Sequence, residues 1–183
     1  MSAAGPTQGG QHRSAQREGM PLKPIEYLTS ERPLTVRRRV RWGECDPAGV
    51  VYTAVFADYV ISAAELFYGA LFGTTPQQAK STLGFGTPSR ALSFDFLSSL
   101  RPDEEFDMTV HVADVRQRTY VLEIVATTPS GEPVFNARLT PVCVARPERR
   151  SIDIPPDFRQ ALLDYQRDCD TAPTTTNTQE TPS

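Results

Sequence analysis

The hydrophobic positions along the chain change their period, and the changes predict the secondary structure. Residues 34–42, LTVRRRVRW, alternate with a period of two, which predicts a strand. Arg38 intrudes on the apolar face of that strand. The other members of this face are Leu34, Val36, Val40 and Trp42. Residues 53–73 are apolar around most of a helical circumference, so we expect a largely buried helix that ends at Gly73.

After a short helix predicted at 75–83, the period returns to two. We expect strands at SRALSFDFLS, EFDMTVHVADV, TYVLEIVATT and PVFNARLTPVCVA, and a turn at 128–131 between the last two. PPDFRQALLDYQRD predicts a final amphipathic helix. A strand, a long buried helix and a run of antiparallel strands are typical of an α+β fold with helices on one face of the sheet. A sheet that curves around the helix would explain the narrow polar line of that helix.

The chain has 183 residues, of which 39% are hydrophobic, enough for one modest core. Polar composition predicts disordered tails at residues 1–30 and 169–183, and a single domain at 31–168. No stretch looks long enough to span a bilayer, and the N-terminal segment lacks the apolar core of a signal peptide. A net charge of −3 gives no reason to expect nucleic acid or a membrane as partner.

The chain's three cysteines fit no zinc framework, so no metal site is expected. They are Cys45, Cys143 and Cys169. An odd number of cysteines without such spacing favours a reducing, cytoplasmic location.

The stretch WGECDPAGVVY at 42–52 places a carboxylate just before the predicted buried helix. Pro47 disfavours helical geometry at Asp46, and Gly49 permits a tight or left-handed turn. The start of a helix offers unpaired N–H groups and a positive dipole end, which stabilise an oxygen that gains negative charge. Asp46 is therefore a candidate nucleophile or general base. Ordinary turn and capping chemistry is the alternative interpretation of Asp-Pro at this place.

Few other residues offer acid–base chemistry. The chain has no G-x-S-x-G motif, and a serine hydrolase would need His111, which we interpret as a solvent-facing or pocket-lining strand residue. Cys45 has no obvious base beside it, which favours a small buried thiol. Glu65 lies on the polar line of the long helix and is interpreted as an interface or surface acid, with catalysis by this carboxylate as the alternative.

The segment RVRWGECDPAGVVYTAVFADY resembles the opening motif of the 4-hydroxybenzoyl-CoA thioesterase family. GFGTPSRALSFDF, DVRQRTYVLEIVATTPSGE and IDIPPDF resemble that family in the same order, so the likeness covers about residues 34–160. It implies the hotdog fold, a curved antiparallel sheet wrapped around a long central helix. It also implies hydrolysis of an acyl-CoA, possible substrates including an aromatic one such as 4-hydroxybenzoyl-CoA. The resemblance implies no cofactor or metal, and a homodimer or homotetramer.

The resemblance also implies roles for single residues. Asp46 matches the family's catalytic aspartate, and Thr53 matches the residue whose backbone N–H meets the thioester carbonyl. Gly49, Tyr52 and Thr87 are expected to shape the substrate site, with Thr87 beside the acyl group.

Arg116 and Arg118 match two members of a basic trio that contacts the phosphates of coenzyme A, which suits the forked guanidinium group. Gln117 takes the middle position, a departure expected to weaken phosphate binding. A solvated hairpin end is the alternative interpretation of this segment. Pro76 lies near the place where the family has a pocket aromatic, which leaves the acyl group open.

Two other functions stay open from the sequence. One is hydrolysis of an acyl group held on a carrier protein in polyketide or fatty-acid biosynthesis, because such a carrier also presents a phosphate. The other is a non-catalytic hotdog module that only binds acyl-CoA or a protein partner. A hydratase on the same fold is disfavoured, since the usual acid–histidine pairing is missing near the helix.

Overall fold

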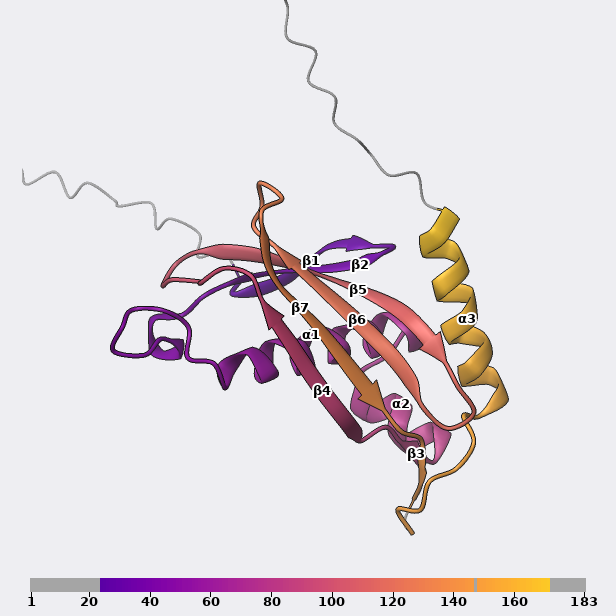
Figure 1. Ribbon diagram of the computed structural model, residues 1–183. Coiled ribbons are helices and arrows are strands. Elements are labelled where there is room, and N and C mark those ends of the chain that lie inside the picture. Colours follow the sequence, from indigo (N-terminus) through magenta and orange to yellow (C-terminus); the bar gives the residue numbers. More distant parts are fainter. Residues whose placement is uncertain (1–23, 147, 172–183) are drawn as a thin grey trace, which may run out of the picture.

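The computed structural model describes residues 24–146 and 148–171 (Figure 1). These residues form a six-stranded antiparallel sheet whose strand order is β1-β2-β5-β6-β7-β4. In that order the strands are β1 (Glu26–Glu31), β2 (Leu34–Arg39), β5 (Glu105–Val115), β6 (Tyr120–Thr127), β7 (Pro133–Pro141) and β4 (Ser89–Phe96). A small second sheet pairs β3 (Phe85–Gly86) with β8 (Val144–Ala145). The helices are α1 (Val55–Phe72), α2 (Pro76–Leu83), α3 (Pro156–Thr171) and the 3-10 turn η1 (Trp42–Glu44).

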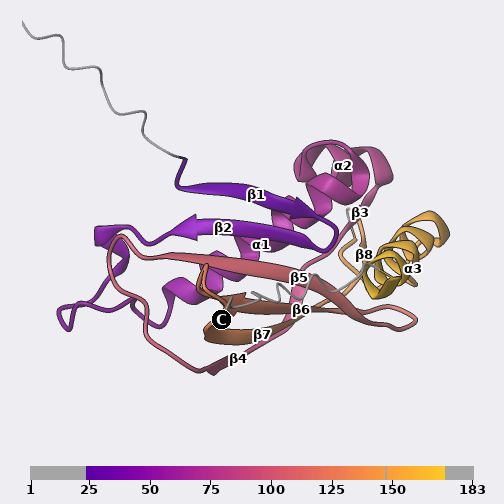
Figure 2. The ribbon, with the colours of Figure 1, turned by 90° about the horizontal axis from the view of Figure 1, so that it is seen from above.

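The sheet curves around α1, which lies along its concave face (Figures 1 and 2). Seven of the helix side chains are buried, among them the aromatic rings of Phe56, Tyr59 and Phe67. Their rings meet those of the sheet, as where Phe56 lies 5.3 Å from Phe135 between ring centroids. This α+β arrangement is the hotdog fold that the sequence predicts. The sheet, α2 and α3 all pack against this apolar helix.

Most of the predicted elements are confirmed with small shifts of their ends. The long helix begins at Val55 rather than residue 53, and Gly73 ends it in a left-handed conformation with φ of 63°. The predicted strand 34–42 ends at Arg39, so Trp42 lies in η1 and is 85% exposed instead of sharing the buried face. The predicted turn at 128–131 is present, with a 2.9 Å hydrogen bond from the Gly131 amide to the Thr128 carbonyl.

The last predicted strand is divided at Pro141 into β7 and β8. Beyond the division the chain leaves the large sheet. The amide of Val142 donates to the carbonyl of Pro88, and the amide of Cys143 donates to the carbonyl of Arg118. The continuous period of two in the sequence hides this break because both pieces are strands.

The predicted domain boundaries need correction at both ends. Five of the six residues of β1, 26–30, fall in the predicted N-terminal tail of residues 1–30, so the prediction of disorder is wrong for these five. Antiparallel pairing with β2 orders β1, although its sequence EYLTSE is too polar to indicate a strand. At the other end α3 continues to Thr171, beyond the predicted boundary at residue 168. The remainder of the two predicted tails, residues 1–23 and 172–183, lies outside the described residues.

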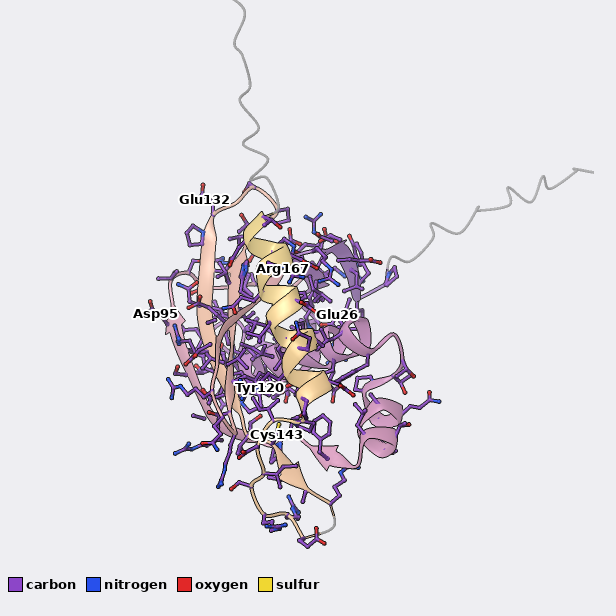
Figure 3. All side chains as sticks on the ribbon, turned by 90° about the vertical axis from the view of Figure 1, so that its right-hand side faces the viewer. Glu26, Asp95, Tyr120, Glu132, Cys143 and Arg167 are labelled. Carbon is purple, nitrogen blue, oxygen red and sulfur yellow. The ribbon has the colours of Figure 1, made fainter. Side chains whose placement is uncertain are left out.

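The helix α3 closes the open end of the core. Its buried residues Phe158, Leu162 and Tyr165 confirm the predicted amphipathic pattern. Phe158 packs against the ring of Tyr120 in β6, with 5.4 Å between ring centroids, and Tyr120 lies near the first turn of α3 (Figure 3). The helix α1 is long and apolar enough to cross a membrane by length and composition, contrary to the expectation from the sequence. Its buried side chains show that it serves as the core helix of this fold.

Candidate functional site

A tight turn between η1 and α1 carries Asp46. The amide of Asp46 donates a 2.9 Å hydrogen bond to the carbonyl of Val50, and the amide of Gly49 donates one of 2.9 Å to the carbonyl of Asp46. An isolated β-bridge pairs Cys45 with Val51 at the base of the turn. Gly49 has a φ of 78°, in the left-handed region that favours glycine, as the sequence predicts. The turn is therefore closed by its own backbone.

The carboxylate of Asp46 is half-buried and only partly engaged. Its Oδ1 accepts a 2.8 Å hydrogen bond from the amide of Ala48. Its Oδ2 accepts no hydrogen bond from any residue that the structure describes. The turn chemistry expected of Asp-Pro is thus present, and it leaves the second carboxylate oxygen available to another molecule.

The chain reaches α1 immediately after this turn. The amide of Val55 donates a 2.8 Å hydrogen bond to the carbonyl of Tyr52, which begins the helical winding. The amide of Thr53 donates to no acceptor within the described part of the chain. Both Tyr52 and Thr53 are exposed. The helix therefore presents an unpaired N–H group to solvent beside the turn of Asp46, together with its positive dipole end.

A second carboxylate, that of Glu44, is buried next to the turn of Asp46, and it was not identified from the sequence. Glu44 is only 6% exposed. Its oxygens accept hydrogen bonds from the Arg41 amide at 2.8 Å, from Arg38 at 2.7 Å and from the hydroxyl of Tyr59 at 2.8 Å. The feature of the sequence that could have revealed Glu44 is Arg38, because a charge on the apolar face of a strand requires a buried partner.

The donors around Glu44 set its ionisation. Burial by itself would raise the pKa of this carboxyl. Hydrogen bonds from the Arg41 backbone and from the side chains of Arg38, Tyr59 and Arg41 outweigh that effect and lower the pKa below its ordinary value. Glu44 is therefore ionised at neutral pH, with its charge opposed by two guanidinium groups.

The other acid–base candidates lie in less suitable places. Burial and the nearby charges of Glu44 and Asp46 raise the pKa of the Cys45 thiol, which keeps it protonated rather than nucleophilic. His111 is half-buried on β5 and lies opposite Glu123 of β6. Glu65 is exposed on α1, as interpreted from the sequence.

Thr87 lies between β3 and β4, next to a part of α1 that is distant from the turn of Asp46. It lines a cavity of about 150 Å³ together with Ile61, Glu65, Tyr68 and Leu139. Ile61 is eight residues beyond Thr53, which corresponds to roughly 12 Å along a helix axis. The cavity that Thr87 lines therefore includes neither Asp46 nor Thr53.

The predicted phosphate-binding residues occupy the hairpin between β5 and β6. Arg116 and Arg118 are exposed, and each pairs with an acid: Arg116 with Asp114 at 2.7 Å, and Arg118 with Asp153 at 3.0 Å. Hydrogen bonds from Gln117 and Arg118 lower the pKa of Asp153.

Arg159 of α3 holds this hairpin by donating hydrogen bonds to the carbonyls of Val115, Arg116 and Gln117. The two exposed arginines therefore stand on a braced turn. Sequence reasoning did not identify this support, because α3 is distant along the chain.

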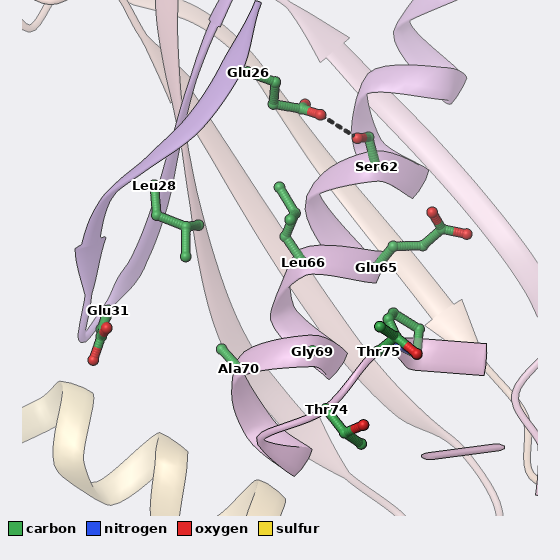
Figure 4. Close-up of a pocket in the computed structure, with 11 residues that line it drawn as sticks. Glu26, Leu28, Glu31, Ser62, Glu65, Leu66, Gly69, Ala70, Thr74 and Thr75 are labelled. Carbon is green, nitrogen blue, oxygen red and sulfur yellow. Dashed lines mark hydrogen bonds between the residues drawn. The ribbon is translucent and has the colours of Figure 1, made fainter. Parts of the chain in front are cut away.

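A further cavity lies between β1 and α1, and neither Asp46 nor Thr53 lines it (Figure 4). It measures about 560 Å³, and the residues that line it include Glu26, Glu31 and Glu65. Ser62 donates a 2.6 Å hydrogen bond to Glu26 across this cavity. No group of three or more potential metal ligands is found in the part of the chain that the structure describes.

Comparison with known proteins places these features in context. The sequence pattern of the thioesterase-like superfamily matches residues 40–162. The chain is 27% identical over 135 residues to the 4-hydroxybenzoyl-CoA thioesterase of Pseudomonas sp. (strain CBS-3), covering 69% of this chain and 95% of that protein.

Solved structures give the same result for the fold. The crystal structure of the Pseudomonas enzyme has a TM-score of 0.61 and 25% identity, covering 69% of this chain and 96% of the other. A 1,4-dihydroxy-2-naphthoyl-CoA thioesterase from Synechocystis has a TM-score of 0.64 and 23% identity, covering 71% of this chain and 95% of the other.

Proposed function

This chain belongs to the thioesterase-like superfamily, and we propose that it hydrolyses acyl-CoA thioesters at the turn that carries Asp46. The observation that carries the proposal is the pairing of a carboxylate that keeps one oxygen unengaged with an unpaired amide at the start of α1. A thioester hydrolase needs these two elements, a group that delivers the nucleophile and a donor for the carbonyl oxygen.

The reaction proceeds in the following way under this proposal. The carbonyl oxygen of the thioester accepts a hydrogen bond from the Thr53 amide and lies at the positive end of the α1 dipole. Asp46 attacks the carbonyl carbon, or takes a proton from a water that attacks it. In both routes the carbon–sulfur bond breaks and the sulfur of coenzyme A takes up a proton. If Asp46 attacked, the acyl group is then held as a mixed anhydride, which water hydrolyses to the free acid and the Asp46 carboxylate; if water attacked, the acid is released directly. Removal of one such donor of the oxyanion site typically costs about 2.7–4 kcal/mol of transition-state stabilisation.

The braced hairpin supplies a place for coenzyme A. Arg116 and Arg118 are exposed and offer forked donors to phosphate groups. Their present partners, Asp114 and Asp153, are exposed or nearly so, and such pairs exchange readily with another anion. An aromatic acyl group is favoured, since two of the similar proteins act on aroyl-CoA thioesters, 4-hydroxybenzoyl-CoA and 1,4-dihydroxy-2-naphthoyl-CoA.

A second copy of the chain completes the site in this proposal. β4 is an edge strand of the six-stranded sheet, and Phe96 at its end is 45% exposed, followed by Leu97 at 49%. An exposed apolar edge strand favours pairing with another strand. A homodimer or homotetramer formed along this edge would supply walls that the single chain lacks.

The free thiols of the described cysteines support a reducing, cytoplasmic compartment.

Thiol release from a panel of aromatic, short-chain and long-chain acyl-CoAs tests the proposal, with Asp46→Asn as the decisive variant. We expect turnover of an aromatic member and a fall in kcat of about 100-fold or more in the variant, with little change in KM. Asp103→Asn is the matched control. It removes the same charge from an exposed residue whose left-handed conformation asparagine also tolerates.

The outcomes separate the alternatives. Binding of acyl-CoA without any thiol release would favour a non-catalytic module. Faster release from a carrier-protein thioester than from the CoA thioester of the same acyl group would favour the carrier-protein function. Near-normal turnover by Asp46→Asn would refute the role of Asp46.

A further inference from the structure

We propose that Glu44 is a positioning residue that fixes Asp46 relative to the Thr53 amide. This inference rests on the proposed function. Glu44 stands two residues before Asp46, and its backbone carbonyl accepts a 3.0 Å hydrogen bond from the amide of Tyr52, which immediately precedes Thr53. One residue therefore adjoins both ends of the loop that holds the two reacting groups.

The side chain of Glu44 is fixed by three separate elements. Arg38 comes from β2, Arg41 precedes η1 and also donates its Nε at 2.8 Å, and Tyr59 lies on the second turn of α1. Because the donors come from a strand, a turn and a helix, the carboxylate joins these elements at one point. A shift of α1 relative to the turn of Asp46 would break at least one of these hydrogen bonds.

Glu44 is not itself placed to react with substrate. It is buried, and its two oxygens already accept four hydrogen bonds. Asp46 is half-buried with an unengaged oxygen. The two acids so close in sequence therefore have different environments, one saturated by donors and one open.

The cluster extends beyond the segment that matches the superfamily, residues 40–162. Arg38 also pairs with Glu26 of β1 at 3.2 Å and stacks over the ring of Tyr59 at 4.5 Å from its centroid. Glu26 in turn accepts the hydrogen bond of Ser62 on α1. β1, outside that segment, is therefore connected to Glu44 through the guanidinium group of Arg38.

Steady-state kinetics of Glu44→Gln and Tyr59→Phe tests the inference. Glu44→Gln keeps the shape of the side chain and removes its charge, whereas Tyr59→Phe removes a single donor and keeps the ring that Arg38 covers. A small misplacement of reacting groups can lower kcat by up to about 100-fold. We expect about a 30-fold loss of kcat in Glu44→Gln and about a 5-fold loss in Tyr59→Phe, with KM changed by less than about 3-fold in both. Glu26→Gln should show a smaller loss than either.

Tyr165→Phe is the matched control for stability. Tyr165 is a buried tyrosine whose hydroxyl makes two hydrogen bonds, to Leu34 and Val110, and it lies on α3 outside the proposed site. The variant Tyr165→Phe should lower the melting temperature at least as much as Tyr59→Phe does, while leaving kcat unchanged. A kcat of Tyr59→Phe equal to that of the wild type, at a lowered melting temperature, would overturn the positioning role even if Glu44→Gln failed to fold.

Failure of the proposed function would look different. In that case the wild-type chain would release no thiol from any acyl-CoA. If the wild type is active and both Glu44→Gln and Tyr59→Phe have its kcat, the proposed thioester hydrolysis stands and only the positioning role is refuted.

Discussion

The hydroxyl of Tyr165 accepts a 2.8 Å hydrogen bond from the backbone amide of Leu34 and donates one of 2.7 Å to the carbonyl of Val110. One phenol on α3 thereby satisfies backbone groups of two neighbouring strands, β2 and β5. Such buried groups would otherwise be left without a partner, at a cost that exceeds the gain from an ordinary hydrogen bond. The C-terminal helix is therefore fastened to the sheet at a defined position.

Replacing this phenol tests the fastening. In Tyr165→Phe the Leu34 amide and the Val110 carbonyl lose their partner inside the core, so the free energy of unfolding should fall by about 1–3 kcal/mol. Urea denaturation measures the change. Tyr52→Phe removes an exposed hydroxyl from a residue that is 57% exposed and should change the free energy of unfolding by less than about 0.5 kcal/mol. Equal stabilities of the two variants would contradict the prediction.

The lowered pKa of Glu44 predicts a loss of stability in acid. A carboxyl whose pKa is lower in the folded than in the unfolded chain stabilises the fold above the ordinary value of 4.5, and this contribution disappears as the pH falls through the folded value. The free energy of unfolding of the wild type should therefore exceed that of Glu44→Gln at about pH 6, and the difference should shrink towards about pH 3. Urea denaturation at a series of pH values measures this difference. A difference that stays constant over the range would show that the charge of Glu44 contributes nothing to stability.

Gly49 provides a test of the turn. Its φ of 78° lies in the left-handed region, and no atom stands within 4 Å of the place where a Cβ would be added. Gly49→Ala therefore introduces backbone strain without a steric clash, and should lower the free energy of unfolding by about 1–2 kcal/mol. Gly43→Ala is the control, because Gly43 is equally open and lacks the left-handed φ. Thermal denaturation of both variants decides the matter, and an equal effect would exclude strain as the cause.

The basic hairpin predicts changes in KM rather than in kcat. Arg118→Ala should raise KM for an acyl-CoA, and Asp153→Asn should lower it by releasing Arg118 from a competing anion. Both effects should weaken at high salt, because exposed charges are screened. Arg138→Ala is the control. The side chain of Arg138 is 56% exposed, against 55% for Arg118, and it also pairs with an acid, Glu123, but it lies on β7 outside the hairpin. A KM in Arg118→Ala that matches that of the control would contradict phosphate binding by this hairpin.

Much of the fold could be predicted because its signals are local. The period of two in EFDMTVHVADV appears in β5 as alternation of buried and half-buried positions. The apolar circumference of residues 53–73 appears only in part in α1, since seven side chains of this helix are buried and that of Ile61 is exposed. Proline and glycine act on their own backbone, so the turn at Asp46 could also be predicted from Pro47 and Gly49.

Predictions failed where a segment depends on partners far along the chain. β1 is polar and forms a strand only because β2 offers a paired edge. The parity of Trp42 places it on the apolar face of the predicted strand, but the strand ends at Arg39, so the side chain is exposed. Neither outcome is encoded in the neighbouring residues.

For this protein the sequence by itself determined the α+β order of elements, the amphipathic faces and the turn that presents Asp46, because these follow from the stereochemistry of nearby residues. Only the tertiary structure decided that Glu44 is buried, that Arg38 and Tyr59 saturate its oxygens, and that Thr87 lies away from the turn. The physical reason is that the ionisation and position of a buried charge depend on donors brought together from several elements, and those donors become neighbours only when the sheet closes around α1.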